Sequence, residues 1–136
     1  SIQKQYKKRA FLHKHPQTLP DFDLKTIKAV QGIGGVCNEG FKDWFDAFEY
    51  MKAEINKSNY DICILGCGAY GFPLAAHVKR MGKKAIHMGG ATQMLFGIKG
   101  KRWEDEYGEF MNEHWIRPSK EETPINAMKI ENGCYW

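Results

Sequence analysis

The chain has 136 residues, of which 43% are hydrophobic and 26% are charged, and its formal net charge is +4. No apolar run approaches the roughly 20 residues needed to cross a bilayer, and the basic segment 1–15 lacks the apolar stretch of a signal peptide. These values exclude a membrane span and suit one globular domain with a single core. We therefore expect a cytoplasmic protein with one domain over residues 1–136.

The cysteines form no C-x-x-C pair and have no metal-ligand spacing. Free thiols in a reducing compartment are favoured over disulfides, and no metal ligands are predicted. The four cysteines are Cys37, Cys63, Cys67 and Cys134.

The first part of the chain predicts an arm, a strand and a helix. Residues 1–20 form an N-terminal arm or short helix. The alternating, β-branched stretch Leu24–Ile33 predicts a strand. Apolar residues at helical spacing make Phe41–Lys57 the clearest helix, because they form one wide stripe.

The middle of the chain predicts a parallel sheet. Tyr60–Leu65 is a nearly continuous apolar run, typical of a strand covered on both faces. A helix over Phe72–Met81 follows, with Gly82 as its stop. Lys84–Met88 predicts a third strand, and Thr92–Phe96 a short helix.

This β-α-β-α-β-α order predicts an α/β fold, a Rossmann-like three-layer sandwich with a short, mostly parallel sheet. Residues 104–136 show no periodic pattern and are predicted to form a C-terminal tail.

A glycine-rich turn joins the strand Tyr60–Leu65 to the following helix. Its letters, Gly66-x-Gly68-x-x-Gly71, match a phosphate-binding pattern in the right context, after a strand and before a helix. Glycines let the backbone approach a phosphate, and the helix N-terminus favours negative charge. The alternative is that a tight turn needs glycine for structural reasons alone.

A second turn, Gly89-Gly90, follows the next strand and can frame a diphosphate together with the first. Residues 62–103 contain no Asp or Glu, which favours an anionic ligand. Dinucleotide binding needs an acidic residue about 20 positions after the turn. Here His87-Met88 occupies that place, so an NAD-binding role is disfavoured.

The segment Gly97–Trp103 is predicted to be a basic loop. Lys101 and Arg102 offer phosphate donors, and Trp103 offers a flat face for a base or a sugar. A solvated loop anchored by a core Trp explains the same residues equally well. Nucleic acid is not expected, because the basic residues do not line one patch with aromatics.

Carboxylates and histidines offer further candidates. Asp21-Phe22-Asp23 has the D-x-D spelling of metal-dependent sugar transfer but precedes a strand, and Glu104–Glu106 suits a solvated turn. Of the two central histidines, His87 is better placed than His77 to contact a ligand, although a core role suits either. No catalytic residue can be assigned from spacing.

The motifs GAYG, GGATQMLFG and GKRW, within residues 61–103, resemble a family of bacterial polysaccharide-biosynthesis proteins similar to GT-D type glycosyltransferases. Two C-terminal motifs, residues 115–118 and 133–136, extend the resemblance over nearly the whole chain. The resemblance implies a nucleotide-sugar-binding, glycosyltransferase-like domain of cell-surface polysaccharide biosynthesis. The expected ligand-binding residues are Gly66, Gly68, Ala69, Tyr70, Gly71, His87, Gly89, Gly90, Gln93, Lys101, Arg102 and Trp103.

The chain departs from that family in one respect. The transferases carry an acidic D-x-E metal motif in an N-terminal half, and nothing in this chain matches it. A divalent metal is therefore implied only for a longer, complete transferase, of which this chain would be the C-terminal part. The alternative is a non-catalytic Rossmann-like nucleotide-binding or regulatory module. The sequence leaves the sugar, the base, the acceptor and the oligomeric state open.

Overall fold

The structure is a computed structural model that describes residues 1–32 and 40–136. These residues divide into two compact units, one formed by Ser1–Leu24 and Gln93–Trp136 and the other by Lys25–Thr92. Each unit has its own cluster of buried side chains. Among the described residues, no helix combines the length and the apolarity needed to cross a membrane.

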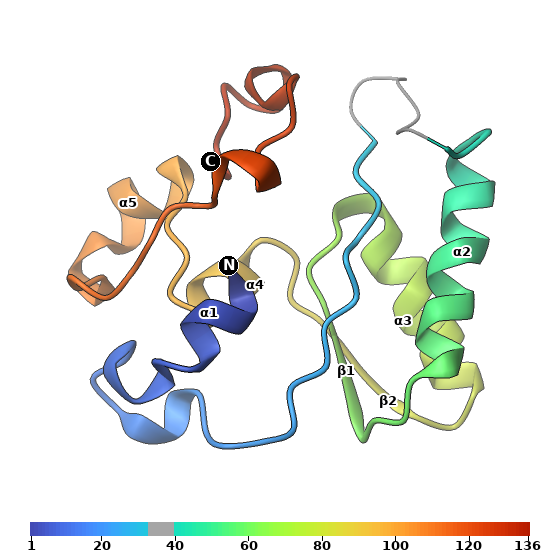
Figure 1. Cartoon of the computed structure of the whole chain (residues 1–136), viewed down its shortest axis with the longest axis horizontal. Coiled ribbons are helices and arrows are strands. Elements are labelled where there is room, and N and C mark those ends of the chain that lie inside the picture. Colours follow the sequence, from blue (N-terminus) through green and yellow to red (C-terminus); the bar gives the residue numbers. More distant parts are fainter. Residues whose placement is uncertain (33–39) are drawn as a thin grey trace. The chain divides into compact units, whose positions relative to one another are not determined.

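The second unit contains a two-stranded parallel sheet and two helices (Figure 1). Strand β1 (Ile62–Leu65) pairs with β2 (Lys84–His87) in a register that puts Ile62 opposite Lys84 and Leu65 opposite His87. Helix α3 (Gly71–Arg80) connects them and packs on both strands, and α2 (Trp44–Lys57) packs on α3. The mixed α/β class and the parallel pairing are confirmed, whereas a three-layer sandwich remains a prediction.

Local signals explain these elements. Asp43 caps α2 by accepting a hydrogen bond from the backbone N–H of Asp46 at 2.9 Å. Gly82, at φ +76°, ends α3 as predicted, and its N–H donates to Lys79 O at 3.0 Å. In the strands, Leu65 is buried while Ile62 and Ile86 are each 48% exposed. The expectation that Tyr60–Leu65 is covered on both faces is therefore wrong.

One predicted strand is absent. Residues 24–32 have no strand pairing, and Ile33, the end of the predicted strand, lies outside the described residues. Ala29 and Val30 are partly buried against the core of the second unit, although no ladder forms there. A strand needs a partner as well as a β-branched pattern, and here the segment runs as irregular chain.

The first unit is built from short helices. Its core contains Leu12, Leu19, Phe96, Ile98 and Trp115. The short α-helices of this part of the chain are α1 (Ile2–Tyr6), α4 (Ala91–Leu95), whose first two residues belong to the second unit, and α5 (Lys101–Tyr107). Short 3₁₀ helices complete the described elements of the chain at Arg9–Phe11, Pro16–Thr18, Gly68–Tyr70, Gly108–Phe110, Lys120–Glu122 and Ala127–Lys129.

A fully buried side chain, Gln5, ties α1 to the rest of the first unit. Its Nε2 donates to Gly97 O and to His114 O, both at 2.9 Å. Gly97 has a positive φ of +62°, and a Cβ there would lie 2.8 Å from Leu12 Cδ2. The backbone at Gly97 can therefore approach Gln5 and Leu12 only because it carries no side chain.

Candidate functional site

The glycine-rich turn follows β1 at its carboxyl end, and two of its three glycines are required by packing. A Cβ on Gly66 would lie 2.5 Å from Thr92 Oγ1 and 3.0 Å from Gly89 O. A Cβ on Gly71 would lie 2.4 Å from His87 Nε2. Gly66 therefore allows the two turns to touch, and Gly71 allows the start of α3 to lie against the end of β2.

Gly68 differs from the other two glycines. Its φ is +52°, which disfavours any side chain, and yet a Cβ there would have no heavy atom within 4 Å. Space is therefore available beside the backbone of Gly68. In dinucleotide-binding turns, the second glycine is the one that lets a pyrophosphate approach the backbone.

The second turn lies beside the first, as predicted. Leu65 O accepts hydrogen bonds from Met88 N–H at 3.0 Å and from Gly89 N–H at 3.1 Å. Gly89 has a positive φ of +56°, and the chain continues through Gly90 into α4. These bonds bring both turns together at the carboxyl ends of two parallel strands, the usual place for ligands in α/β proteins.

The N-terminus of α3 is open to an anion. Tyr70, the N-cap residue, makes no side-chain capping hydrogen bond, and the first turn contains no acidic residue. His87 is exposed and lies against Gly71, while Ala69 is exposed on the turn itself. Gly71 N–H already donates to Gly68 O and Pro73 has no N–H, so it is the dipole of this ten-residue helix that favours negative charge beside the glycine turn.

Tyr70 itself belongs to the core. The ring is 7% exposed and stacks on Trp44, with centroids 4.9 Å apart and an interplanar angle of 3°. Trp44 stacks in turn on Phe48 at 5.1 Å. This aromatic stack holds the 3₁₀ turn against α2, so a ligand at the turn would meet the backbone of Tyr70 and not the face of its ring.

The remaining four predicted site residues belong to the first unit, where three of them gather on the C-terminal residues. Gln93 Nε2 donates to Tyr135 O at 2.9 Å, and Trp103 Nε1 donates to Gln93 Oε1 at 3.4 Å. Arg102 donates from its backbone N–H to Cys134 O at 3.0 Å. The fourth, Lys101, is exposed at the start of α5.

Two details of this group differ from the sequence-based expectation. Lys101, Arg102 and Trp103 were predicted in a loop, but they form the first turn of α5. The Arg102 guanidinium is also engaged, because it forms an ion pair with Glu131 and donates to Tyr135 Oη at 3.1 Å. These partners come from the segment predicted to be a C-terminal tail, and sequence spacing could not reveal them.

The side chains of Cys67 and His77 have structural roles that account for their positions. Burial, together with the nearby Cys63, raises the pKa of Cys67 to about 11, so the thiol stays protonated at neutral pH. His77 Nε2 lies 2.8 Å from Asn56 Oδ1, and burial followed by the charge of Lys52 lowers the pKa of His77. The three cysteines in the described part of the chain are free thiols, whereas Cys37 lies outside it.

Thr92 is a candidate that the sequence did not indicate. Its Oγ1 is buried, lies against Gly66 and has no hydrogen-bond partner among the described residues. A buried hydroxyl without a partner is unusual. The only sequence signal was its place three residues after Gly89.

The residues that the structure describes do not fit a divalent metal. Across residues 1–32 and 40–136, no group of three or more His, Cys, Asp or Glu side chains is arranged to hold a metal ion. Asp21, in the D-x-D segment, pairs with Arg9 at 2.6 Å, and Glu104 pairs with Arg117. Both carboxylates are therefore satisfied by arginines.

Comparison with known proteins does not extend this description: no family model matches the chain, and no curated protein or solved structure is significantly similar to it.

Proposed function

We propose that the two glycine turns of the second unit bind the phosphate of a small-molecule ligand. The observation that carries the proposal is Gly68, which combines a positive φ with open space where its neighbours Gly66 and Gly71 are packed. The start of α3 lies beside it, and the dipole of this helix favours negative charge there. Residues 62–103 contain no Asp or Glu, so no carboxylate of this segment repels a phosphate.

We further propose that the ligand is a nucleotide sugar and that the chain is a glycosyltransferase-like domain of polysaccharide biosynthesis. This identity rests on the resemblance of the GAYG, GGATQMLFG and GKRW motifs. The diphosphate would lie across the two turns, and a positive side chain would neutralise it as a leaving group. Within the first unit, Lys101 is exposed, whereas the guanidinium of Arg102 is already paired with Glu131.

A non-catalytic nucleotide-binding module is the second candidate. The observation that favours it is the engagement of Asp21 and Glu104 by arginines, together with the protonated Cys67 thiol. Binding without turnover would be the signature of this candidate.

The test compares two glycines that have the same backbone requirement. Gly68 and Gly82 both have positive φ and both have open space at the Cβ position, but Gly82 lies at the far end of α3. Gly68→Asp and Gly82→Asp therefore introduce the same strain and the same charge, one inside the proposed site and one outside it. Thermal shifts would be measured with UDP-, GDP- and dTDP-sugars, and with NAD(H) and NADP(H) for comparison.

We expect a nucleotide sugar to raise the Tm of the wild type and of Gly82→Asp, and to leave that of Gly68→Asp unchanged. A ligand at about 100 times its Kd adds roughly 2.7 kcal/mol to the free energy of unfolding. Equal shifts in both variants would remove the glycine turn from the site. Release of the nucleotide from the bound sugar would separate a transferase from a binding module.

A further inference from the structure

The first unit contains an open groove that the proposed function does not use. It lies between α1 and the chain that follows Pro20, and its volume is about 620 Å³. This volume falls in the range of small-molecule sites. The residues that matter for its chemistry are Lys4, Tyr6, Lys7, Phe22, Asp23 and Leu24.

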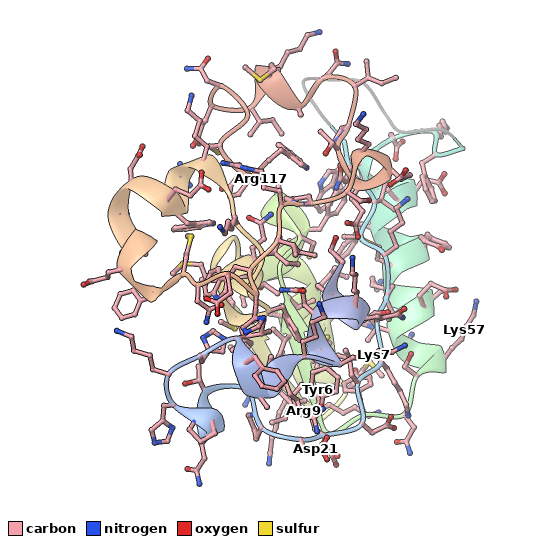
Figure 2. The ribbon with its side chains drawn as sticks, turned by 60° about the vertical axis from the view of Figure 1, so that its left-hand side comes forward. Tyr6, Lys7, Arg9, Asp21, Lys57 and Arg117 are labelled. Carbon is pink, nitrogen blue, oxygen red and sulfur yellow. The ribbon has the colours of Figure 1, made fainter. Side chains whose placement is uncertain are left out.

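One wall of the groove is held in place by satisfied polar groups. Tyr6 Oη donates to Phe22 O at 2.6 Å and accepts from Phe22 N–H at 2.5 Å. The Arg9 guanidinium lies 4.8 Å from the centre of the Tyr6 ring and pairs with Asp21 at 2.6 Å. Figure 2 shows Tyr6, Arg9 and Asp21 close together at the end of α1. The shape of the groove is therefore set before any ligand arrives.

Positive charge at the groove is available to a ligand. Lys4 lies on α1 and Lys7 is its C-cap residue, which keeps a helical backbone; both are exposed, and their spacing of three residues puts their side chains on one side of the helix. Neither ammonium group has an ion-pair partner in the part of the chain that the structure describes. Residues 1–20 contain no Asp or Glu at all. Two such ammonium groups suit a phosphate, which accepts charge-assisted hydrogen bonds.

The same wall also suits a sugar ring. Phe22 is 39% exposed and its ring lies 4.7 Å from that of Tyr6, which gives a flat apolar face next to Leu24. A sugar ring has an apolar face that can stack on such a surface, and it carries hydroxyl groups around its edge. The Asp23 carboxylate can accept hydrogen bonds from these hydroxyls while it keeps its other interaction, since a carboxylate has about four acceptor sites.

We propose that this groove binds one phosphorylated sugar unit, with the phosphate on Lys4 and Lys7, the ring on Phe22 and the hydroxyls on Asp23. The unit can be a free sugar phosphate or the ribose phosphate of a nucleotide. A nucleic acid strand fits less well, because Asp21 and Asp23 flank Phe22 and repel a continuous row of phosphates. This site is separate from the glycine turns and does not depend on them.

The experiment titrates the ¹⁵N-labelled chain with ribose 5-phosphate, glucose 1-phosphate, ribose, glucose and inorganic phosphate, and follows the amide resonances by NMR. We expect both sugar phosphates to shift residues 3–7 and 22–24, with at least tenfold weaker binding of phosphate alone and of the free sugars. Tighter binding of ribose 5-phosphate than of glucose 1-phosphate would indicate a nucleotide as the source, and the reverse a free hexose phosphate. Both results support the groove.

Two pairs of variants separate the groove from general electrostatic attraction. Lys4→Gln with Lys7→Gln should weaken sugar-phosphate binding at least tenfold. Lys8→Gln with Lys14→Gln removes the same charge from exposed positions outside the groove, and should change binding less than twofold. Equal weakening by both pairs would overturn the proposal.

A third variant tests the ring contact. Phe22→Ala should weaken sugar-phosphate binding about tenfold and leave the binding of inorganic phosphate unchanged. Shifts confined to residues 66–71 and 89–92 would overturn the groove and support the glycine turns instead. Shifts confined to the groove, with no effect of Gly68→Asp on them, would support the groove independently of the proposed function.

Discussion

At the scale of single residues, Cys67 links the glycine turn to pH. Burial raises the pKa of its thiol from an ordinary value of 9.0 to about 11. Between these two values the unfolded chain loses the thiol proton while the native chain keeps it. The free energy of unfolding should therefore fall as pH rises from 9 to 11, and should gain nothing from this group below pH 9.

This prediction can be checked by urea denaturation of the wild type and of Cys67→Ala at several pH values. As pH rises above 9, the free energy of unfolding of the wild type should fall relative to that of Cys67→Ala. Lysines and tyrosines titrate in the same range in both proteins, so their contributions to the pH dependence cancel in this comparison. Parallel pH curves would contradict a buried, protonated thiol.

The glycines of the site could be predicted from the sequence, whereas the orientation of its larger side chains could not. The junction of a strand and a helix calls for glycine at Gly66, Gly68 and Gly71, whether for packing or for a ligand. Tyr70 and Arg102 are different, because their directions are set by partners distant in sequence. Tyr70 stacks on Trp44, and Arg102 pairs with Glu131. Nothing near either residue in the sequence specifies such a partner.

At the scale of elements, the stack of Tyr70, Trp44 and Phe48 joins the glycine turn to α2. Trp44→Ala should lower the free energy of unfolding by about 3 kcal/mol, because it removes two stacked contacts and leaves a cavity. It should also loosen the turn, and so weaken any phosphate bound at Gly68. Urea denaturation and near-UV circular dichroism would measure the loss.

Phe45 provides the matched control, since it is the next residue of α2 and is 70% exposed. Phe45→Ala removes only an edge contact with Trp44, with ring centroids 5.2 Å apart, and should lower the free energy of unfolding by no more than about 1 kcal/mol. Similar losses in the two variants would show that the stack contributes no more than helix propensity does.

The elements with strong local signals were predicted correctly. The helix predicted over Phe41–Lys57 is α2, and the strand predicted over Lys84–Met88 is β2, each within three residues of its expected bounds. The strand expected over Leu24–Ile33 is absent from residues 24–32, the described part of that range, because pairing depends on a distant neighbour. Helix α5 was missed because its start carries no side-chain cap: the N-cap residue is Gly100, which reads as part of a loop.

At the scale of the whole molecule, the two clusters of buried side chains share no residue. Leu74 belongs to the core of the second unit and is 2% exposed, while Leu12 belongs to the core of the first and is fully buried. Replacement of a buried leucine by alanine destabilises a core by about 3–5 kcal/mol. Each replacement should therefore act first on its own unit.

Amide hydrogen exchange of the full chain can test this expectation. Leu74→Ala should accelerate exchange mainly in residues 44–92, and Leu12→Ala mainly in residues 1–24 and 93–117. A uniform acceleration along the chain in both variants would indicate that the two cores unfold as one cooperative unit.

The contact between Gly66 and Thr92 also constrains how this sequence can change. A methyl group on residue 66 would lie 2.7 Å from Thr92 Cβ, so the two positions share one volume. Alanine at 66 becomes acceptable only when residue 92 has already lost its side chain, and the order of the two mutations then matters. This pair would behave epistatically: each turn limits the substitutions open to the other, although Gly66 and Thr92 are 26 positions apart in the chain.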